Sequence, residues 1–190
     1  MNTPYTLYLG LGSNLGNRRV WLDLAIKHLR AVADILALQV SPVFIESAPH
    51  GCAIAQGFYL NTVVSCQTHL RPLAVLGICQ HIEATLGRCR LNASADDCSG
   101  SGLALEVGGK RAFQASRPRT VDIDILEIWH ENQPLFINLS PQLIVPHPRL
   151  FERDFMRLPL EALKSCSAAS ENFEKSLDRT RLTPKEINGG

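Results

Sequence analysis

The segment that most constrains this sequence covers residues 117–126, where apolar and acidic side chains alternate. Its apolar members are Val121, Ile123 and Ile125, and between them lie Asp122 and Asp124. A period of two is typical of a β-strand, and residues two apart leave the same face of the strand. The two carboxylates therefore point the same way, with Cα atoms roughly 7 Å apart. The pattern predicts a strand with one apolar face and one acidic face.

Two carboxylates held this close repel each other, and burial alone would push one of them to bind a proton. A divalent cation removes the conflict. Magnesium takes oxygen ligands, usually one or two carboxylates together with substrate phosphates. Arg117 and Arg119 lie just upstream, where their guanidinium groups could hold such phosphates. From the residues alone, a half-exposed strand with a solvated acidic face remains an alternative.

Length and composition favour one domain with a substantial core, because the 190 residues are 45% hydrophobic and 19% charged. The formal net charge of +1 gives no electrostatic case for nucleic acid or for an anionic membrane. No apolar run approaches the roughly 18 residues that span a bilayer, and residues 1–8 lack the pattern of a signal peptide. We therefore expect a cytoplasmic protein with neither nucleic-acid nor membrane partners.

The six cysteines include no C-x-x-C pair and no zinc-like spacing. Reduced thiols are expected, with a disulfide at Cys98 as the alternative. The six are Cys52, Cys66, Cys79, Cys89, Cys98 and Cys166.

Periodicity and turn residues give a coarse order of strand, helix, strand, strand, helix, strand. Strands are expected at 5–11, 39–46, 58–67 and around 121–126. Helices are expected at 18–34, from Pro72 to just before Gly87, and from Leu160 onward. Asn17 or Ser13 could cap the first helix. The glycine- and serine-rich composition of residues 91–109 predicts a long loop, which is either a functional lid or a tolerated surface insertion.

Two polar features need an explanation. Asn61 lies inside an expected strand, where asparagine is disfavoured, so it either bonds to a nearby loop or serves a ligand. Gln80 and Glu83 are three residues apart on an expected helix, and by themselves predict an ordinary solvated pair.

With these segments assembled, the chain resembles the 6-hydroxymethyl-7,8-dihydropterin pyrophosphokinase family. The two most specific matching segments are residues 117–126 and the stretch Val145-Pro146-His147-Pro148-Arg149 with Glu152-Arg153-Asp154-Phe155. The other matches occur in family order: Gly12-Ser13-Asn14-Leu15-Gly16, Phe58-Tyr59-Leu60-Asn61, and Gln80 through Glu83 with Gly87-Arg88. Together they cover roughly residues 5–163.

The resemblance implies an α+β, ferredoxin-like α/β/α sandwich, with a mainly antiparallel sheet and helices on both faces. It implies transfer of the pyrophosphoryl group of ATP to 6-hydroxymethyl-7,8-dihydropterin, with release of AMP, in folate biosynthesis. Asp122 and Asp124 match the carboxylates that hold two magnesium ions. The implied catalytic residues are Arg88, Arg119, Asp122 and Asp124.

The same resemblance assigns the substrate contacts. ATP would be bound by Gln80, Glu83, Arg88, Arg119, Ile125, His147 and Arg153, with Ile125 reading adenine through its backbone. The pterin would be bound by Ser47, Ala48, Pro49, Tyr59, Asn61 and Phe155. Tyr59 and Phe155 would sandwich the flat ring, and Asn61 would read its amide edge by donating and accepting hydrogen bonds.

We expect one pyrophosphokinase domain at 1–166, with a long flexible catalytic loop at 88–116, and a partly disordered polar tail at 167–190. A monomer is expected, with a dimer as the alternative. Ser116-Arg117 stands where the family usually has Trp-Gly, so the lid contact is either missing or supplied elsewhere, for instance by Phe113. We expect retained activity with altered ATP affinity. Three alternatives stay open: a catalytically impaired homologue, a ferredoxin-like nucleic-acid-binding module, and a two-metal nuclease or cyclase.

Overall fold

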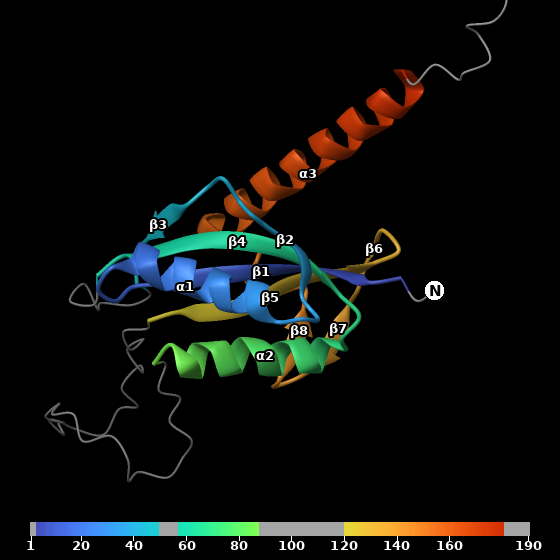
Figure 1. The fold of residues 1–190 in the computed structure, drawn as a ribbon. Coiled ribbons are helices and arrows are strands. Elements are labelled where there is room, and N and C mark those ends of the chain that lie inside the picture. The colour runs from blue at the N-terminus through green and yellow to red at the C-terminus, as the bar shows by residue number, and fades with distance from the viewer. Residues whose placement is uncertain (1–2, 50–56, 88–119, 181–190) are drawn as a thin grey trace, which may run out of the picture.

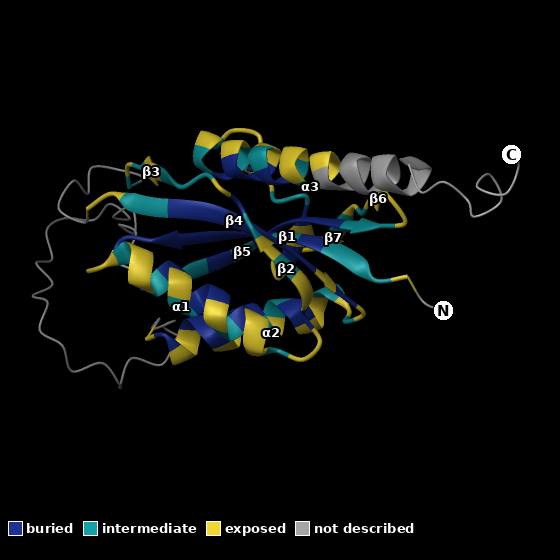
Figure 2. Cartoon of the chain, turned by 45° about the horizontal axis from the view of Figure 1, so that its top comes forward, coloured by how far each residue is buried: buried dark blue, intermediate teal, exposed yellow. Residues whose placement is uncertain are grey.

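The computed structural model describes residues 3–49, 57–87 and 120–180, and these form three layers (Figures 1 and 2). The middle layer is an antiparallel sheet in the order β2-β4-β1-β5-β6, with β3 paired to β4. Its strands are β1 (Tyr5–Ser13), β2 (Leu36–Val40), β3 (Ile45–Ser47), β4 (Tyr59–Thr68), β5 (Asp122–His130) and β6 (Gln133–Pro134). A separate pair is formed by β7 (Ile137–Leu139) and β8 (Leu143–Val145).

Helices cover both faces of the sheet. α1 (Arg18–Ala31) and α2 (Pro72–Thr85) lie on one face, and α3 (Asp154–Thr180) lies on the other (Figure 2). This arrangement confirms the expected α+β, ferredoxin-like class with a mainly antiparallel sheet. No described helix is both long enough and apolar enough to cross a membrane.

The face beneath α1 and α2 holds the larger core. It is built by alternate residues of the central strands, such as Leu7, Leu9 and Leu11 of β1, because every second side chain leaves the same face. Leu22 and Leu29 of α1 pack against this face and are fully buried. The acidic strand contributes its apolar side to this core, and these residues are Ile123, Ile125 and Ile128.

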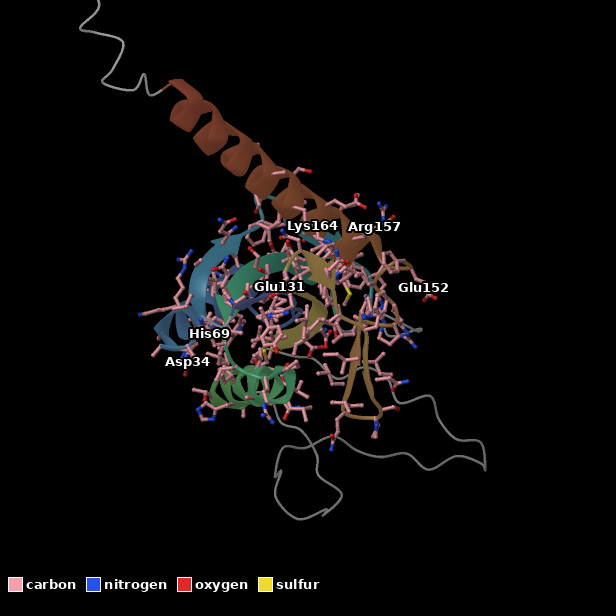
Figure 3. All side chains as sticks on the ribbon, turned by 90° about the vertical axis from the view of Figure 1, so that its right-hand side faces the viewer. Asp34, His69, Glu131, Glu152, Arg157 and Lys164 are labelled. Carbon is pink, nitrogen blue, oxygen red and sulfur yellow. The ribbon has the colours of Figure 1, made fainter. Side chains whose placement is uncertain are left out.

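The face beneath α3 holds a second, smaller core. Its buried members are Val63, Leu126, Leu150, Met156, Leu160 and Leu163. A polar contact adds to this packing, because Lys164 of α3, labelled in Figure 3, donates to Oε2 of Glu127 at 2.5 Å. The indole N–H of Trp129 donates to the same oxygen at 2.7 Å. α3 is therefore held on the sheet by both apolar and charged contacts.

α3 begins at Asp154, six residues before the expected start at Leu160. Pro159 lies inside this helix, in its second turn, and its missing N–H removes one intrahelical hydrogen bond. Met156 lies four residues before Leu160 and extends the same buried stripe. The apolar face therefore gains from a helix that starts earlier, and this earlier start places Phe155 in the first turn.

The expected strand at 39–46 is divided into β2 and β3. Pro42 has no N–H to give to a neighbouring strand, and Ser41 turns inward, where its hydroxyl donates to the Pro159 carbonyl of α3 at 2.8 Å. Other boundaries differ less. β1 continues to Ser13, and α1 ends at Ala31, with Asn17 as its N-cap. The expected loop at 88–116 and the last ten residues lie outside the described residues.

Candidate functional site

The middle strands of the sheet present two rows of residues toward α3. Gly12 of β1 lies between Asn61 of β4 and Asp122 of β5. Two residues away on the same strand face, Gly10 lies between Val63 and Asp124. A cavity of about 270 Å³ opens above these rows. It is lined mainly by β1, β4, β5 and the first turn of α3, and its wall includes Ser47, Ala48, Tyr59, Asn61, Asp122, Asp124, Arg149, Arg153, Phe155 and Met156.

The two glycines of β1 form the floor of this cavity. A Cβ at Gly12 would lie only 3.0 Å from Oδ1 of Asn61, which is closer than side chains normally approach. A Cβ at Gly10 would lie 3.2 Å from the Leu126 side chain. Because neither residue has a side chain, the space between β4 and the acidic strand stays open to a ligand.

Asn61 is buried and its amide orientation is set by its partners. Its Nδ2 donates to the carbonyl of Ile45 at 3.1 Å and to the hydroxyl oxygen of Ser47 at 3.0 Å. A carbonyl can only accept, so the nitrogen must be the atom that faces Ile45. Both amide hydrogens are thus used within the protein, and Oδ1 is the atom above Gly12. Asn61 can offer a ligand an acceptor, whereas the resemblance implies that it both donates and accepts.

Two aromatic rings reach the cavity from different layers. Tyr59 comes from the first residue of β4, and Phe155 from the first turn of α3, and both are half-buried. The guanidinium carbon of Arg153 lies 5.6 Å from the centre of the Phe155 ring. The structure therefore brings the two predicted rings to one cavity, with Asn61 beside them.

Charged side chains of both signs also line the cavity, and the two acidic ones lie on its β5 side. Asp122 and Asp124 are half-buried, and both line the cavity, as the strand period predicts. Arg149 and Arg153 line it as well. The Nε of Arg153 is buried and has no hydrogen-bond partner among the described residues. A buried donor of this kind costs free energy until an acceptor meets it, and an anionic ligand would supply one.

His147 lies near these charged side chains, between two prolines. Its backbone N–H donates to the carbonyl of Leu126 in β5 at 2.8 Å, and its Nδ1 accepts the backbone N–H of Arg149 at 3.2 Å. Burial, followed by the positive charges of Arg153 and Arg149, lowers the pKa of His147, while Asp122 acts in the opposite direction. With Nδ1 occupied as an acceptor, the neutral ring carries its hydrogen on Nε2.

Several predicted residues lie away from the cavity wall. Ile125 is buried on the opposite face of β5, beneath α1 and α2. Pro49 is half-buried and does not line the cavity, in contrast to its exposed neighbour Ala48, which does. Arg88 and Arg119 lie outside the described residues.

The prediction that Gln80 and Glu83 form a solvated pair is wrong. Gln80 is half-buried, and Glu83 is 0% exposed, with Oε1 accepting the backbone N–H of Ile123 at 2.8 Å. The helix face that carries Glu83 also carries the core residues Cys79 and Ile82, so it turns toward β5.

Sequence reasoning missed six residues that line the cavity: Gly10, Leu11, Gly12, Thr62, Arg149 and Met156. Arg149 had a signal, because it stands two residues after His147 in the Pro-His-Pro-Arg stretch. Gly12 also had a signal, because it belongs to the turn-rich segment Gly12-Ser13-Asn14-Leu15-Gly16. Gly10 and Met156 have none, since only the pairing of β1 with β4 and β5 and the docking of α3 bring them to the site.

Comparisons with known proteins show the family to which this chain belongs. The family model described as 7,8-dihydro-6-hydroxymethylpterin-pyrophosphokinase (HPPK) matches residues 8–165. A protein of Bacillus subtilis (strain 168) named 2-amino-4-hydroxy-6-hydroxymethyldihydropteridine pyrophosphokinase is 36% identical over 153 residues, which cover 80% of this chain and 74% of that protein.

Relatives with the same name occur in two further bacteria. The protein of Porphyromonas gingivalis (strain W83) is 36% identical over 81% of this chain and 87% of its own length. The protein of Methylorubrum extorquens (strain AM1) is 32% identical over 80% of this chain and 78% of its own length. The chain therefore belongs to the 7,8-dihydro-6-hydroxymethylpterin-pyrophosphokinase family.

Proposed function

We propose that this protein transfers the pyrophosphoryl group of ATP to 6-hydroxymethyl-7,8-dihydropterin, giving the pterin diphosphate and AMP, in folate biosynthesis. One observation carries the proposal for this chain: a single cavity has an aromatic ring and an amide on its β4 side and paired carboxylates on its β5 side, and a second ring and two arginines also line it. A flat heterocycle and a polyphosphate need these two environments side by side. Family membership supplies the particular substrates.

The aromatic rings and the amide suit the pterin. Tyr59 and Phe155 can stack on its ring, which adds about 0.5–1.5 kcal/mol per ring beyond area burial. Oδ1 of Asn61 accepts a hydrogen bond, and a pterin offers N–H donors along its pyrimidinone edge. Ser47 supports this contact because it accepts one Nδ2 hydrogen and so holds the amide in place. We assign Ser47, Ala48, Pro49, Tyr59, Asn61 and Phe155 to the pterin.

The paired carboxylates suit magnesium, and we propose two ions. Asp122 and Asp124 fit this role because they supply hard oxygen ligands from one strand face, beside the space left by Gly10 and Gly12. Among the described residues, no three acidic, histidine or cysteine side chains gather into a metal site. Water and phosphate oxygens would complete the coordination. Bound magnesium neutralises phosphate charge and aligns the attacking and leaving oxygens.

The remaining polar residues bind and orient the triphosphate. Arg153 presents its buried Nε to an acceptor, and Arg149 adds positive charge at the cavity wall. His147, held neutral with its hydrogen on Nε2, acts as a hydrogen-bond donor and not as a base. Positioning and charge neutralisation carry most of such a transfer. We assign Gln80, Arg88, Arg119 and Ile125 to the nucleotide side, with Arg88 and Arg119 joining the two aspartates in catalysis.

The proposal is tested by following AMP formation from ATP and magnesium, with and without the hydroxymethyl-dihydropterin. We expect AMP release that requires the pterin and falls by at least about a hundredfold in Asp122→Ala, because a metal ligand is lost. Glu161→Ala, an exposed carboxylate on α3, is the control and should keep wild-type turnover. Release of ADP, or AMP release without the pterin, would contradict the proposal.

We also propose that the protein works as a monomer in the cytoplasm. The buried Cys66 and Cys79 are free thiols, which suits a reducing compartment. Light scattering on the purified chain checks the oligomeric state: a mass near 20.9 kDa is expected, and twice this mass would indicate the dimer.

A further inference from the structure

Glu83 is a carboxylate in an unfavourable place. It belongs to the last turns of α2, is 0% exposed, and faces the core between α2 and the sheet. Removing a carboxylate from water costs free energy that only hydrogen bonds or opposite charges can offset. A residue of this kind at this position therefore has a specific partner.

Its partner lies on the acidic strand. Oε1 of Glu83 accepts the backbone N–H of Ile123 at 2.8 Å, although the two residues are 40 positions apart in the chain. Ile123 is the residue between Asp122 and Asp124, so its peptide N–H belongs to the strand segment that carries both carboxylates. Losing this bond would leave a buried backbone N–H without a partner, at a cost of about 1–3 kcal/mol.

The strand needs this support because, among the described strands, residues 122–126 have a neighbour on one side only. β6 pairs with β5 only at Trp129 and His130, so no described strand pairs with residues 122–126 on the side away from β1. Backbone groups along such an edge must find other partners. Glu83 takes the N–H of Ile123, and the backbone of His147 takes the carbonyl of Leu126. The edge is thus held at two points, one on each side of Asp124.

We infer that Glu83 is a positioning residue: it holds the peptide of Ile123, and through it the orientation of Asp122 and Asp124 toward the cavity. This inference rests on the proposed role of the two aspartates as magnesium ligands. It gives Glu83 a task different from the ATP contact that the resemblance implies. In this role the reach of the side chain matters more than its charge.

Two conservative variants of Glu83 distinguish the effect of side-chain length from the effect of charge. Glu83→Gln keeps the length and an oxygen acceptor but loses the charge, whereas Glu83→Asp keeps the charge but is one methylene too short to reach Ile123. The matched controls are Glu161→Gln and Glu161→Asp, at an exposed helical position of α3. A positioning role predicts that Gln is tolerated and Asp is not.

The first measurement needs neither substrate nor metal. Amide hydrogen exchange at Ile123 is compared with exchange at Val64, whose position in the centre of β4 reports opening of the whole fold. In Glu83→Asp we expect Ile123 to exchange at least about tenfold faster relative to Val64, because a bond of about 1.5 kcal/mol or more is lost. In Glu83→Gln we expect a change of less than about threefold.

The second measurement is the magnesium dependence of AMP release. Glu83→Asp should need about tenfold more magnesium for half-maximal rate, in the range that lost support of metal ligands costs. The KM for the pterin should stay within about threefold, because Tyr59 and Asn61 lie on β4. Glu83→Gln should resemble the wild type in both respects.

Two results would overturn the inference: unchanged exchange at Ile123 in both variants, or better function in Glu83→Asp than in Glu83→Gln, which would make Glu83 a charged ligand. Failure of the proposed function looks different. If the wild type released no pterin-dependent AMP, the exchange result would still decide whether Glu83 holds Ile123. Magnesium-induced shifts of the Asp122 and Asp124 amides would then decide whether that contact orients a metal site.

Discussion

At the scale of single residues, the site depends on which atoms are already committed within the protein. Asn61 gives both amide hydrogens to Ile45 and Ser47, and this leaves one acceptor for a ligand. His147 uses Nδ1 to accept a backbone N–H, and this leaves Nε2 as a donor. In both residues, hydrogen bonds within the protein determine whether the remaining polar atom can donate to a ligand or accept from it.

Asn61→Asp tests the acceptor role. The aspartate would place an oxygen where Nδ2 now donates to the Ile45 carbonyl, so two acceptors would face each other at a buried position. The cost is about 1–3 kcal/mol. We expect the pterin KM to rise roughly tenfold or more while the ATP KM changes less than about threefold. Steady-state kinetics with each substrate varied in turn check this, and an equal rise of both constants would argue against recognition by Asn61.

His147 gives stability a pH dependence with a definite sign. Burial and the charges of Arg153 and Arg149 put its folded-state pKa below the ordinary value of 6.5, so the unfolded chain binds the proton first as the pH falls. The histidine therefore costs nothing at high pH and destabilises the fold progressively below about pH 6.5.

Urea unfolding of the wild type and of His147→Gln, from about pH 7.5 to about pH 5.5, measures this effect. The unfolding free energy of the wild type should fall relative to that of the variant across this range, because the variant lacks the titrating group. Parallel profiles would show that His147 titrates alike in the folded and unfolded chain.

At the scale of elements, β1 decides the depth of the cavity. Its apolar residues fill the core beneath α1 and α2, while on the other face Gly10 and Gly12 leave space between β4 and β5. α3 then closes the space from above and brings Arg153, Phe155 and Met156 with it. The cavity thus belongs to no single element, since strands give its floor and a helix gives part of its wall.

Gly12→Ala tests the floor. The new Cβ would lie 3.0 Å from Oδ1 of Asn61, so the amide must shift from the position in which it accepts a ligand hydrogen. We expect a loss of about 1–3 kcal/mol in stability and a raised pterin KM. Gly77→Ala is the matched control: Gly77 lies inside α2 with no atom within 4 Å of a new Cβ, so the variant should gain about 0.5–1 kcal/mol. Thermal unfolding and pterin kinetics on both variants check the contrast.

At the scale of the whole molecule, two cores hold the sheet between its helical layers. Cys66 and Cys79 lie in the larger core, and burial raises the pKa of each thiol to about 12. A neutral, buried thiol is a poor nucleophile. Cys166 lies exposed on α3. The three positions therefore report separately on the surface and on the packing beneath α1 and α2.

Thiol labelling turns this difference into a measure of global opening. In a variant with Cys52, Cys89 and Cys98 replaced by serine, one thiol per chain should react rapidly at about pH 8 and two only upon unfolding. As urea is raised, Cys66 and Cys79 should become reactive with the same midpoint as the unfolding transition followed by circular dichroism. Rapid reaction of all three thiols in native protein would show that the larger core opens independently of the rest.

The sequence by itself determined the elements whose signals are local. The alternation of residues 121–125 predicted a strand with both aspartates on one face, and helical periodicity predicted α1 and α2 to within a few residues. These signals survive without the rest of the chain because they rest on backbone geometry and on the free energy of burying one face.

Only the tertiary structure decided which residues meet. The burial of Glu83, the early start of α3, the space above Gly10 and Gly12 and the committed hydrogens of Asn61 all depend on contacts between segments far apart in the sequence. A pattern of side chains along one segment carries no information about the partner that another segment brings. For this reason the sequence predicted which carboxylates and rings belong to the site, but the fold determines their spacing, their hydrogen bonds and the cavity between them.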